Sequence, residues 1–535
     1  MKNLFLVTII SLCVNIAEAQ WTSNTDINTS ASDLTGVLNT NMATTQSGKT
    51  YITYFSGTPG NYVFWVQMID RNGYRKFGNN GVQLLSTSAS WISKTYLTTD
   101  SKENLYITFC DIATVQHYIQ KVDTSGNKLF GINGKPVNLS LPGCLKISQD
   151  STILFSDIDG NIFKYSALGD SIWTRHISLD TSEVKDIMPL SDGRFYALLL
   201  KNITNSGGYV NHFLQLYNSD GTPVWTNPVQ LSMNYSNLSI TSASLVLGEN
   251  NTVYSATSFP ISGSSAYIFI QKTDISGNVL WGNDGIQTIS TPSIVCYNFS
   301  LKYISTLNQL ICNIGCLNYL QDSSSILLQK IDANGNLLLS NSGITLVPMS
   351  DDEPYLGASE LCSDMNNVLC YKDEQSNKVH SLKSDLSGNI IWQKIIGVNV
   401  NFNNAAGDLM MGKDGDDWLV FSFTEDRTSL AGGNEKLYVQ NIKCDGNFTL
   451  VNEINNIDYS LTLFPNPASE LLNITSDKFH NNLQVEIFDI NGRLLTNEQF
   501  NGHEIKLDVS SFKNGIYFIH LSSPEINRYL KFIKM

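Results

Sequence analysis

The sequence predicts an all-β protein in which an eight-bladed β-propeller is followed by a small immunoglobulin-like (Ig-like) β-sandwich. Three observations support this fold class. One short turn recurs eight times at intervals of 43 to 58 residues, an apolar run precedes each copy by about twenty residues, and the segment from Tyr459 to the end lacks the turn. A seven-bladed ring, in which the weak copy around Gly446 is a linker, is the alternative.

The repeated turn is clearest at Asp274-Ile275-Ser276-Gly277, with Trp281 four residues further on. Asp, Asn or Ser stands three residues before the glycine in seven of the eight copies, and a large apolar residue stands four residues after it in all eight. Asp, Asn and Ser side chains hydrogen-bond the backbone two residues on, and glycine adopts a positive φ without a Cβ clash. We therefore expect a hairpin loop at each copy. The eight glycines are Gly73, Gly126, Gly169, Gly221, Gly277, Gly335, Gly388 and Gly446.

The strand before each turn carries apolar residues on both faces. An aliphatic residue stands seven positions before the glycine in seven of the eight copies, and glutamine follows it in six of the eight. Such a strand is covered from both sides. With the preceding apolar run, each repeat has room for about four short strands. Units of this length with four strands are typical of propeller blades, which protect their edges by ring closure.

The N-terminal residues are expected to close the ring. Trp21-Thr22-Ser23-Asn24 is similar to the segment that follows the turn in other repeats, such as Trp225-Thr226-Asn227. This similarity predicts that the segment joins the last blade as a strand and ties the two ends of the ring together.

Because the hairpins follow the pattern Asp-x-x-Gly-x-x-x-Trp, the chain from about residue 30 to residue 455 resembles the broad superfamily of bacterial propellers with quinoprotein-like and related repeats. The resemblance implies the propeller fold and no particular activity. The spacing differs from that of the sialidase Asp-box, in which Asp and Gly are two residues apart.

The first residues predict export. Met1-Lys2-Asn3 precedes the mainly apolar run from Leu4 to Ile16, and Ala17-Glu18-Ala19 follows. This pattern is typical of a cleavable signal peptide, here residues 1–19, with cleavage between Ala19 and Gln20. We expect the propeller at residues 20–455 and a separate domain at residues 456–535.

The C-terminal segment carries motifs of its own. They are Phe464-Pro465-Asn466-Pro467-Ala468, the stretch from Val485 to Arg493, and the stretch from Leu507 to Ile519, followed by a basic last strand. Apolar and polar residues alternate between these turns, as expected for a small sandwich with one buried face.

In these motifs and their order, the segment closely resembles the type A C-terminal sorting domain of the type IX secretion system of Bacteroidota. The resemblance implies that the type IX secretion machinery is a partner. It also implies passage through the periplasm to the outer cell surface or the medium. The motif residues are Pro465, Asn466, Pro467, Gly492, Gly515, Lys531 and Lys534.

Composition excludes some partners. The net charge is −14 and only 15% of the residues are charged. Nucleic acids and anionic membranes require basic surface, so neither is expected as a partner. No later segment is apolar over the roughly 18 residues that a membrane span needs.

Eight cysteines remain after the expected removal of Cys13. Cys362 and Cys370 are equally distant from Asn366 in a polar turn, so we expect them to face each other across a hairpin and to form a disulfide. Cys312 and Cys316 lie on or next to one strand roughly 13 Å apart, too far to bond to each other. Pairing of either with another cysteine such as Cys296, or burial as free thiols, remains open.

No motif predicts catalysis. The seven histidines form no pair at metal-ligand spacing, and the patterns of serine hydrolases, phosphate loops and Cys-x-x-Cys redox centres are absent from the sequence. We expect no catalytic residue and no cofactor. Ca²⁺ remains an alternative at three acidic segments that we interpret as turns or solvated loops: Asp157 to Asn161, Asp351 to Glu353 and Asp414 to Asp417.

We therefore expect a secreted or surface-displayed module for binding or adhesion, with an extracellular glycan or protein as ligand. An extracellular carbohydrate-active hydrolase or lyase is the alternative, because scattered carboxylates leave no local signature. Specificity is expected in irregular polar segments between the hairpins, namely Ser56 to Asn61, Asn202 to Tyr209, Ser258 to Ser265, Val347 to Tyr355 and Thr424 to Asn434.

Overall fold

The computed structural model describes residues 21–22, 24–25, 28–58, 60–85, 88, 94–111, 116–177, 181–202, 209–234, 242–262, 265–291, 294–373, 375–398, 409–427, 434–448, 461–490, 493–522 and 527–535. The predicted signal peptide and its cleavage site between Ala19 and Gln20 fall outside these ranges. The chain forms two compact units that divide between Thr449 and Leu450. The predicted boundary between residues 455 and 456 also lies outside the described ranges and stays a prediction.

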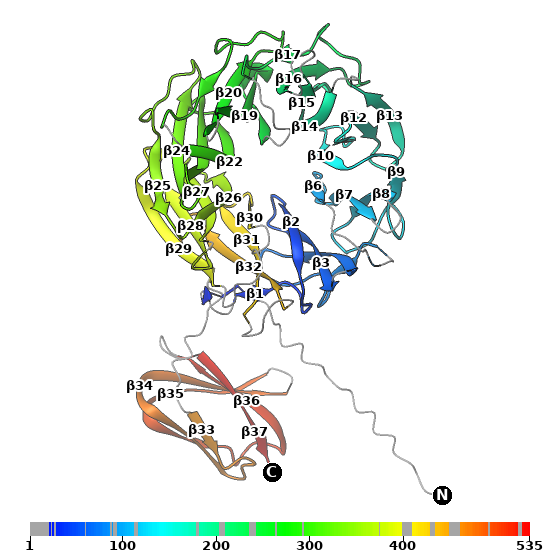
Figure 1. Cartoon of the computed structure of the whole chain (residues 1–535). Helices are drawn as coiled ribbons and strands as arrows, with labels where there is room; N and C mark the ends of the chain where they lie inside the picture. The colour runs from blue at the N-terminus through cyan, green and yellow to red at the C-terminus, as the bar shows by residue number, and fades with distance from the viewer. Residues whose placement is uncertain are drawn as a thin grey trace, which may run out of the picture. The chain divides into compact units, whose positions relative to one another are not determined.

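The first unit is a ring of antiparallel four-stranded blades (Figure 1). Blade 1 contains β2 (Leu38–Thr44), β3 (Thr50–Thr58), β4 (Asn61–Ile69) and β5 (Val82–Gln83); blade 2 contains β6 (Tyr96–Thr99), β7 (Leu105–Asp111), β8 (Gln116–Val122) and β9 (Lys135–Val137); blade 3 contains β10 (Pro142–Ile147), β11 (Ile153–Asp157), β12 (Asn161–Tyr165) and β13 (Ser171–His176); blade 4 contains β14 (Thr181–Pro189), β15 (Phe195–Asn202), β16 (Val210–Tyr217) and β17 (Val229–Gln230). Blade 5 contains β18 (Ala243–Leu247), β19 (Val253–Ser262), β20 (Ser265–Thr273) and β21 (Ile286–Gln287), with the short 3-10 helix η2 (Glu249–Asn251) between its first two strands; blade 6 contains β22 (Ile294–Ile304), β23 (Gln309–Asn318), β24 (Ser324–Asp332) and β25 (Ile344–Ser350); blade 7 contains β26 (Pro354–Leu361), β27 (Asn367–Asp373), β28 (Lys378–Ser384) and β29 (Ile390–Val398); blade 8 contains β30 (Met410–Lys413), β31 (Trp418–Glu425), β32 (Lys436–Lys443) and β1 (Thr29–Ser30).

The described residues thus form eight blades, and the predicted all-β propeller is confirmed. Strands β2, β6, β10, β14, β22, β26 and β30 lie nearest the centre in Figure 1. Blades 5 and 6 share one sheet because β20 and β22 form a single parallel pair, Ala266 with Val295.

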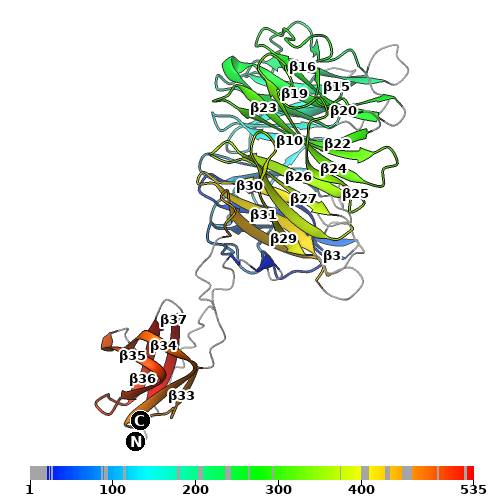
Figure 2. The same cartoon turned by 90° about the vertical axis from the view of Figure 1, so that its left-hand side faces the viewer.

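The order of the strands gives the ring two different faces, which Figure 2 shows from the side. Each blade begins at its innermost strand and ends at the rim. The turns between first and second and between third and fourth strands therefore lie on one face, which we call the hairpin face. Connections between second and third strands and between successive blades lie on the opposite face, the loop face.

The repeated turn folds as its residues predict. The Asp274 carboxylate accepts hydrogen bonds from the backbone N–H groups two and four residues on, both at 2.9 Å, and Gly277 has a φ of 91°. The Gln271 side chain donates to the carbonyl of Gly282 at 2.8 Å and accepts from the N–H of Trp281 at 3.1 Å. The repeated glutamine therefore gives hydrogen-bond partners to backbone groups beside the turn. Backbone groups that are buried in a protein need such partners.

Neighbouring blades contact each other through the apolar residue after one turn and the glycine of the next. A Cβ atom on Gly277 would lie 3.0 Å from the Trp225 ring, so the contact requires a glycine. The Trp225 indole N–H also donates to the carbonyl of Ile275 at 3.2 Å. Three other tryptophans make the same bond to the carbonyl two residues before the next glycine: Trp173, Trp281 and Trp392.

Trp21 makes this contact where the two ends of the ring meet. Its indole N–H donates to the carbonyl of Arg71, two residues before Gly73, and a Cβ atom on Gly73 would lie 3.2 Å from its ring. Gln440, the repeated glutamine of blade 8, donates to the carbonyl of Thr22 at 2.7 Å. Trp21 thus contacts blade 1 in the same way as Trp225 contacts blade 5.

Strand β1 completes blade 8. Thr29 pairs with Val439 and Ser30 pairs with Tyr438 of β32, so the N-terminal segment supplies the outermost strand. The N-terminal segment therefore closes the ring, as predicted, but the residues that pair as a strand are Thr29 and Ser30 instead of the predicted stretch that begins at Trp21.

The second unit is a small antiparallel β domain. It contains β33 (Leu461–Phe464), β34 (Leu471–Asp489), β35 (Leu494–Asp508), β36 (Gly515–Ser522) and β37 (Asn527–Lys534). Both halves of β34 pair with β35, but the first half also pairs with β33 and the second half with β36. The register shifts between the two halves, and both contribute to one core that includes Leu472, Val485, Ile519 and Phe532. The single sheet therefore folds over on itself and gives the predicted sandwich-like domain.

Candidate functional site

The ring contains a cavity of about 620 Å³ between the innermost strands of blades 2 to 6. We call it the channel pocket. Most of its lining comes from the first halves of these strands, on the side of the loop face. The lining residues are Lys94, Tyr96, Leu97, Gly143, Cys144, Leu145, Lys146, Glu183, Lys185, Asp186, Ser242, Ala243, Ser244, Asn298 and Phe299.

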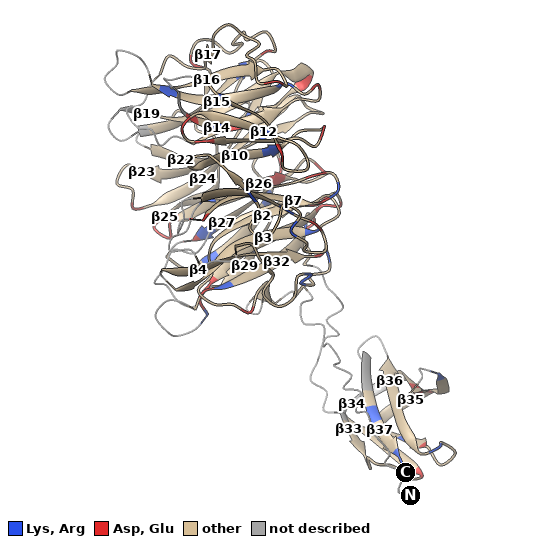
Figure 3. Ribbon diagram, turned by 90° about the vertical axis from the view of Figure 1, so that its right-hand side faces the viewer, with Lys and Arg blue, Asp and Glu red and all other residues tan. Residues whose placement is uncertain are grey.

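Charged residues of both signs meet in the channel pocket. The Lys146 ammonium of blade 3 lies 2.9 Å from the Asp186 carboxylate of blade 4, and Lys185 lies 2.5 Å from Glu183. Lys94 is exposed, with its ammonium 5.1 Å from the centre of the Tyr96 ring. Basic and acidic residues are also interspersed over the rest of the ring (Figure 3).

Asp186 occupies a special position in its strand. The ladder between β14 and β15 shifts register beside it, and its carboxylate accepts bonds from the N–H groups of Ile187 and Leu245, both at 2.9 Å. In blades 1 and 6, Asn41 and Asn298 lie at similar bulges and bind the next blade, in each case through a side-chain amide 2.7 Å from a backbone carbonyl. Asp186 keeps the link between blades and adds a negative charge to the pocket.

Several groups in the channel pocket are held in their protonated forms. Burial and the nearby Cys144, Glu183 and Asp186 raise the pKa of Tyr96, so its phenol stays neutral. Burial, reinforced by Asp186, raises the pKa of the Cys144 thiol to about 12. Burial alone would lower the pKa of Lys146, but the Asp186 carboxylate outweighs it and the pKa is raised. These groups can donate hydrogen bonds to a ligand, whereas none of them is a ready proton acceptor near neutral pH.

The five irregular segments expected to give specificity lie on the loop face by strand order. Four connect the second and third strands of blades 1, 4, 5 and 8, and the fifth connects blade 6 to blade 7. Residues 59, 203–208, 263–264 and 428–433 of these segments lie outside the described ranges. The channel pocket and the predicted specificity segments therefore share one face of the ring.

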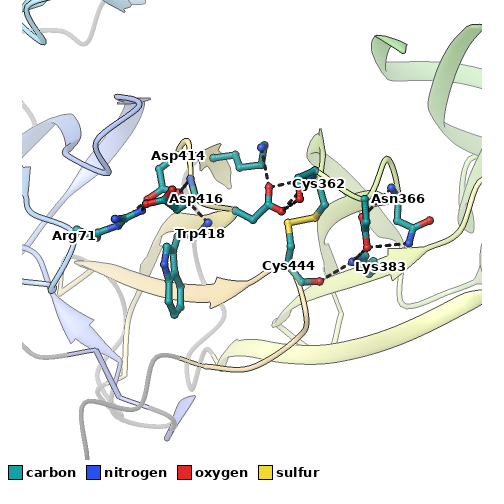
Figure 4. A network of polar contacts seen from close by, with 12 residues as sticks. Arg71, Cys362, Asn366, Lys383, Asp414, Asp416, Trp418 and Cys444 are labelled. Carbon is teal, nitrogen blue, oxygen red and sulfur yellow. Dashed lines mark hydrogen bonds and ion pairs between the residues drawn. A yellow bond between two sulfur atoms is a disulfide. The ribbon is translucent and has the colours of Figure 1, made fainter. Parts of the chain in front are cut away.

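The acidic segment from Asp414 to Asp417 lies on the hairpin face, away from the pocket. Arg71 of blade 1 pairs with Asp414 at 2.7 Å and with Asp416 at 2.5 Å (Figure 4). Asp417 pairs with Lys413 at 3.0 Å and accepts from the N–H of Ser363 of blade 7. These carboxylates are held by cations and link blades 7, 8 and 1.

The predicted disulfide between Cys362 and Cys370 is wrong. Cys362 is bonded to Cys444 (Figure 4). Cys370 is a buried free thiol. Both bonded residues lie on the hairpin face of adjacent blades, 82 positions apart in the sequence. The carbonyl of Cys444 also accepts bonds from Lys383 at 2.8 Å and Trp392 at 3.2 Å, so this disulfide belongs to the contact between blades 7 and 8.

The other acidic segments form turns. The Asp157 carboxylate accepts from the N–H groups of Asp159 and Asn161 at 3.1 and 2.8 Å, as expected for a tight hairpin. Asp351 to Glu353 connect blade 6 to blade 7. In the part of the chain that the structure describes, no group of three or more His, Cys, Asp or Glu side chains is placed to hold a metal ion.

The residues of the channel pocket were missed at the level of sequence. Lys146 is a single charge in β10, whereas Glu183 and Asp186 lie in β14 together with Lys185. The available signal was the presence of three charged residues within four positions of one strand.

In the second unit, the sorting motif holds the last strand in place. The Asn466 side chain, between Pro465 and Pro467, accepts from the N–H of Ile533 at 2.9 Å and donates to the carbonyl of Lys531 at 3.1 Å. Lys531 is exposed, Lys534 is largely buried, Gly515 begins β36, and Gly492 lies outside the described residues.

Curated relatives cover only part of the chain. An endo-acting ulvan lyase of Formosa agariphila is 28% identical over 170 residues, which are 32% of this chain and 27% of the lyase. The chain therefore spans about a quarter of the curated relative that it matches.

Similar solved structures are distant in sequence. PorZ, a surface component of the type IX secretion system of Porphyromonas gingivalis, is 11% identical with a TM-score of 0.37, over 93% of this chain and 70% of PorZ. The Dos1 propeller is 11% identical with a TM-score of 0.38, over 71% of this chain and 88% of that structure. The polysaccharide lyase Uly1 is 9% identical with a TM-score of 0.37, over 78% of this chain and 92% of the lyase. Likeness at this level decides neither ligand nor activity.

The second unit is assigned by its family. Residues 462–535 match the secretion system C-terminal sorting domain. Among the described residues, no helix is long and apolar enough to cross a membrane. Residues 462–535 therefore form a C-terminal sorting domain of the type IX secretion system, which directs the chain to the cell surface or into the medium.

Proposed function

We propose that the ring is an extracellular binding module that takes a polysaccharide segment at the channel pocket. The observation that carries this proposal is the pocket itself. Its volume of about 620 Å³ lies within the roughly 300 to 1,000 Å³ that small-ligand sites occupy. The sorting domain supports the same proposal, because export brings the chain into contact with extracellular polymers.

The lining suits a hydroxylated ligand. Carboxylates of Glu183 and Asp186 accept hydrogen bonds from sugar hydroxyls, and the ammonium groups and the Tyr96 phenol donate them. Phe299 and Tyr96 add apolar ring surface, on which the C–H face of a sugar packs. Lys94 is exposed near the mouth of the pocket and is well placed to meet an acidic substituent of the polymer.

A polysaccharide lyase is the second candidate, and the partial identity to an endo-acting ulvan lyase favours it. Lyase chemistry needs a group that accepts a proton from the carbon next to the sugar carboxylate. The raised pKa values of Tyr96 and Lys146 keep both groups protonated, which supports binding over elimination.

A glycan array with the full exported chain, followed by incubation with each bound polymer, tests both candidates. Binding to an acidic or neutral polysaccharide without new reducing ends or unsaturated uronate products supports the binding module. Steady release of such products, lost in the Tyr96→Phe variant, would establish the lyase instead. Absence of binding to every extracellular polysaccharide on the array would overturn both.

A further inference from the structure

Two cysteines of blade 6 face each other across neighbouring strands. Cys296 of β22 is the direct partner of Cys316 of β23, and their Sγ atoms lie 3.5 Å apart. Directly opposed residues of antiparallel strands have Cα atoms about 4.5 to 5.5 Å apart, which is within the range that a disulfide spans. The sulfur atoms must approach each other by about 1.5 Å to reach the length of a disulfide bond.

The third cysteine of this region is not a competing partner. Cys312 lies on β23 four residues before Cys316, roughly 13 Å along the strand, and it pairs with Leu301 instead. All three thiols belong to one buried cluster between blades 5 and 6. Cys312 therefore serves as a matched control of the same type, burial and strand.

Export supplies the oxidising conditions. The sorting domain takes the chain across the cell envelope, where disulfides form and persist. The side chains of Cys296 and Cys316 are nearly inaccessible in the folded ring, with 2% and 1% of their surfaces exposed. Hydrogen bonding between the two thiols, together with burial, raises the pKa of Cys316, which slows attack by its thiolate in the folded state. Oxidation must therefore precede the packing of blade 5 against blade 6.

We propose that Cys296 and Cys316 form a second disulfide in the exported protein. The oxidant is an external protein disulfide of the periplasm. The thiolate of one of the two cysteines attacks this disulfide and forms a mixed disulfide with the external protein. The thiolate of the other cysteine then attacks the sulfur of the first cysteine in this mixed disulfide. The Sγ–Sγ bond forms, the external disulfide leaves as a dithiol, and the two thiol protons end on its sulfur atoms.

The bond would fix the strand that enters the channel pocket. The ladder between β22 and β23 shifts register directly after Cys296, and Asn298 and Phe299 of the pocket follow within three residues. A covalent link at this point holds the bulge that directs these residues. The proposal concerns a modification of the chain and does not depend on which ligand the pocket takes.

Thiol labelling tests the proposal on the full chain secreted by a type IX host. The protein is denatured in an alkylating reagent without reduction and then mapped by peptide mass spectrometry. We expect a linked peptide pair that contains Cys296 and Cys316, a second linked pair that contains Cys362 and Cys444, and label on Cys110, Cys144, Cys312 and Cys370.

Two variants sharpen the test. Cys316→Ser is expected to expose Cys296 to label, whereas Cys312→Ser leaves the linked pair unchanged. The proposal is overturned if Cys296 and Cys316 both carry label in the unreduced wild-type chain. It is equally overturned if Cys296 is linked to Cys312 or to another cysteine.

Discussion

Trp21 and Arg71 join the N-terminal segment of the ring to its first blade. The Trp21 indole N–H donates to the Arg71 carbonyl at 2.7 Å, and the residue is 2% exposed. The same bond recurs between other neighbouring blades, as between Trp225 and Ile275. The end-to-end contact is therefore one more copy of the contact that holds the blades together.

Replacing Trp21 with alanine is expected to destabilise the ring. Truncating a buried tryptophan costs about 3 to 5 kcal/mol, and the carbonyl of Arg71 loses its donor as well. Chemical denaturation of the full chain, followed by tryptophan fluorescence and circular dichroism, measures the loss. Trp281→Ala is the matched control and should cost a similar amount, because Trp281 is also buried and donates the same bond to the carbonyl of Ala333. A Trp21→Ala ring as stable as the wild type would show that the N-terminal contact does not close the ring.

The repeated glutamines are expected to contribute to stability at each blade. Gln440→Leu removes the donor to the carbonyl of Thr22, and Gln329→Leu removes the donor to the carbonyl of Thr288, and both carbonyls belong to buried residues. Each change leaves a buried carbonyl unsatisfied, which costs about 1 to 3 kcal/mol. Urea unfolding of both variants checks this expectation. A loss at Gln329 with none at Gln440 would mean that the closing blade is held in a different way.

The raised pKa of Glu425 predicts that the stability of the ring depends on pH. Burial raises the pKa of Glu425 from 4.5 to about 7, although Arg427 at 2.5 Å opposes the shift. The folded state therefore binds a proton more tightly than the unfolded chain does. The stabilising effect of this proton is present below pH 4.5 and is lost as the pH rises to about 7, a change on the order of 3 kcal/mol.

The Glu425→Gln variant should lack this part of the pH dependence. Urea unfolding at pH 5 and pH 8 measures the free energy of unfolding of both proteins. We expect the stability of the variant, relative to that of the wild type, to increase as the pH rises. If the variant and the wild type differ in free energy of unfolding by the same amount at both pH values, the raised pKa of Glu425 is contradicted.

Removing the sorting domain should stop export while leaving the ring folded. The chain divides into two compact units, and residues 462–535 lie in the second. Fractionation of a type IX-competent host should find a chain that ends before residue 459 in the periplasm. Asn466→Ala, which removes two hydrogen bonds to the last strand β37, should reduce secretion in the same assay. Normal amounts of the truncated chain outside the cell would reject a sorting role.

Local patterns of the sequence predicted most of the fold. The spacing of Asp274, Gly277 and Trp281 was enough to predict the hairpin, because an Asx turn and a positive φ depend on neighbouring residues alone. The same pattern predicted that Trp21 belongs to the ring. The pairing of Thr29 and Ser30 was missed, because two polar residues carry no strand pattern and their partners lie about 400 positions away in the chain.

The site was less predictable for the same physical reason. Lys146 and Asp186 meet only because the ring places β10 beside β14, and neither strand alone shows that the two charges form a pair. The partner of Cys362 was wrong because the hairpin turns two residues earlier than assumed, which places Cys370 opposite Ala358, whereas Cys444 reaches Cys362 from the next blade. Contacts between blades depend on ring geometry that no local spacing contains.

Calorimetric titration of the polysaccharide selected on the array into two lysine variants of the full chain tests the central claim most directly. Lys94 lines the channel pocket, and Lys102 is an exposed lysine of the same blade on the hairpin face. We expect Lys94→Ala to weaken binding by about tenfold, or about 1.4 kcal/mol, and Lys102→Ala to bind like the wild type. Wild-type affinity in Lys94→Ala, or an equal loss in both variants, would contradict binding at the channel pocket.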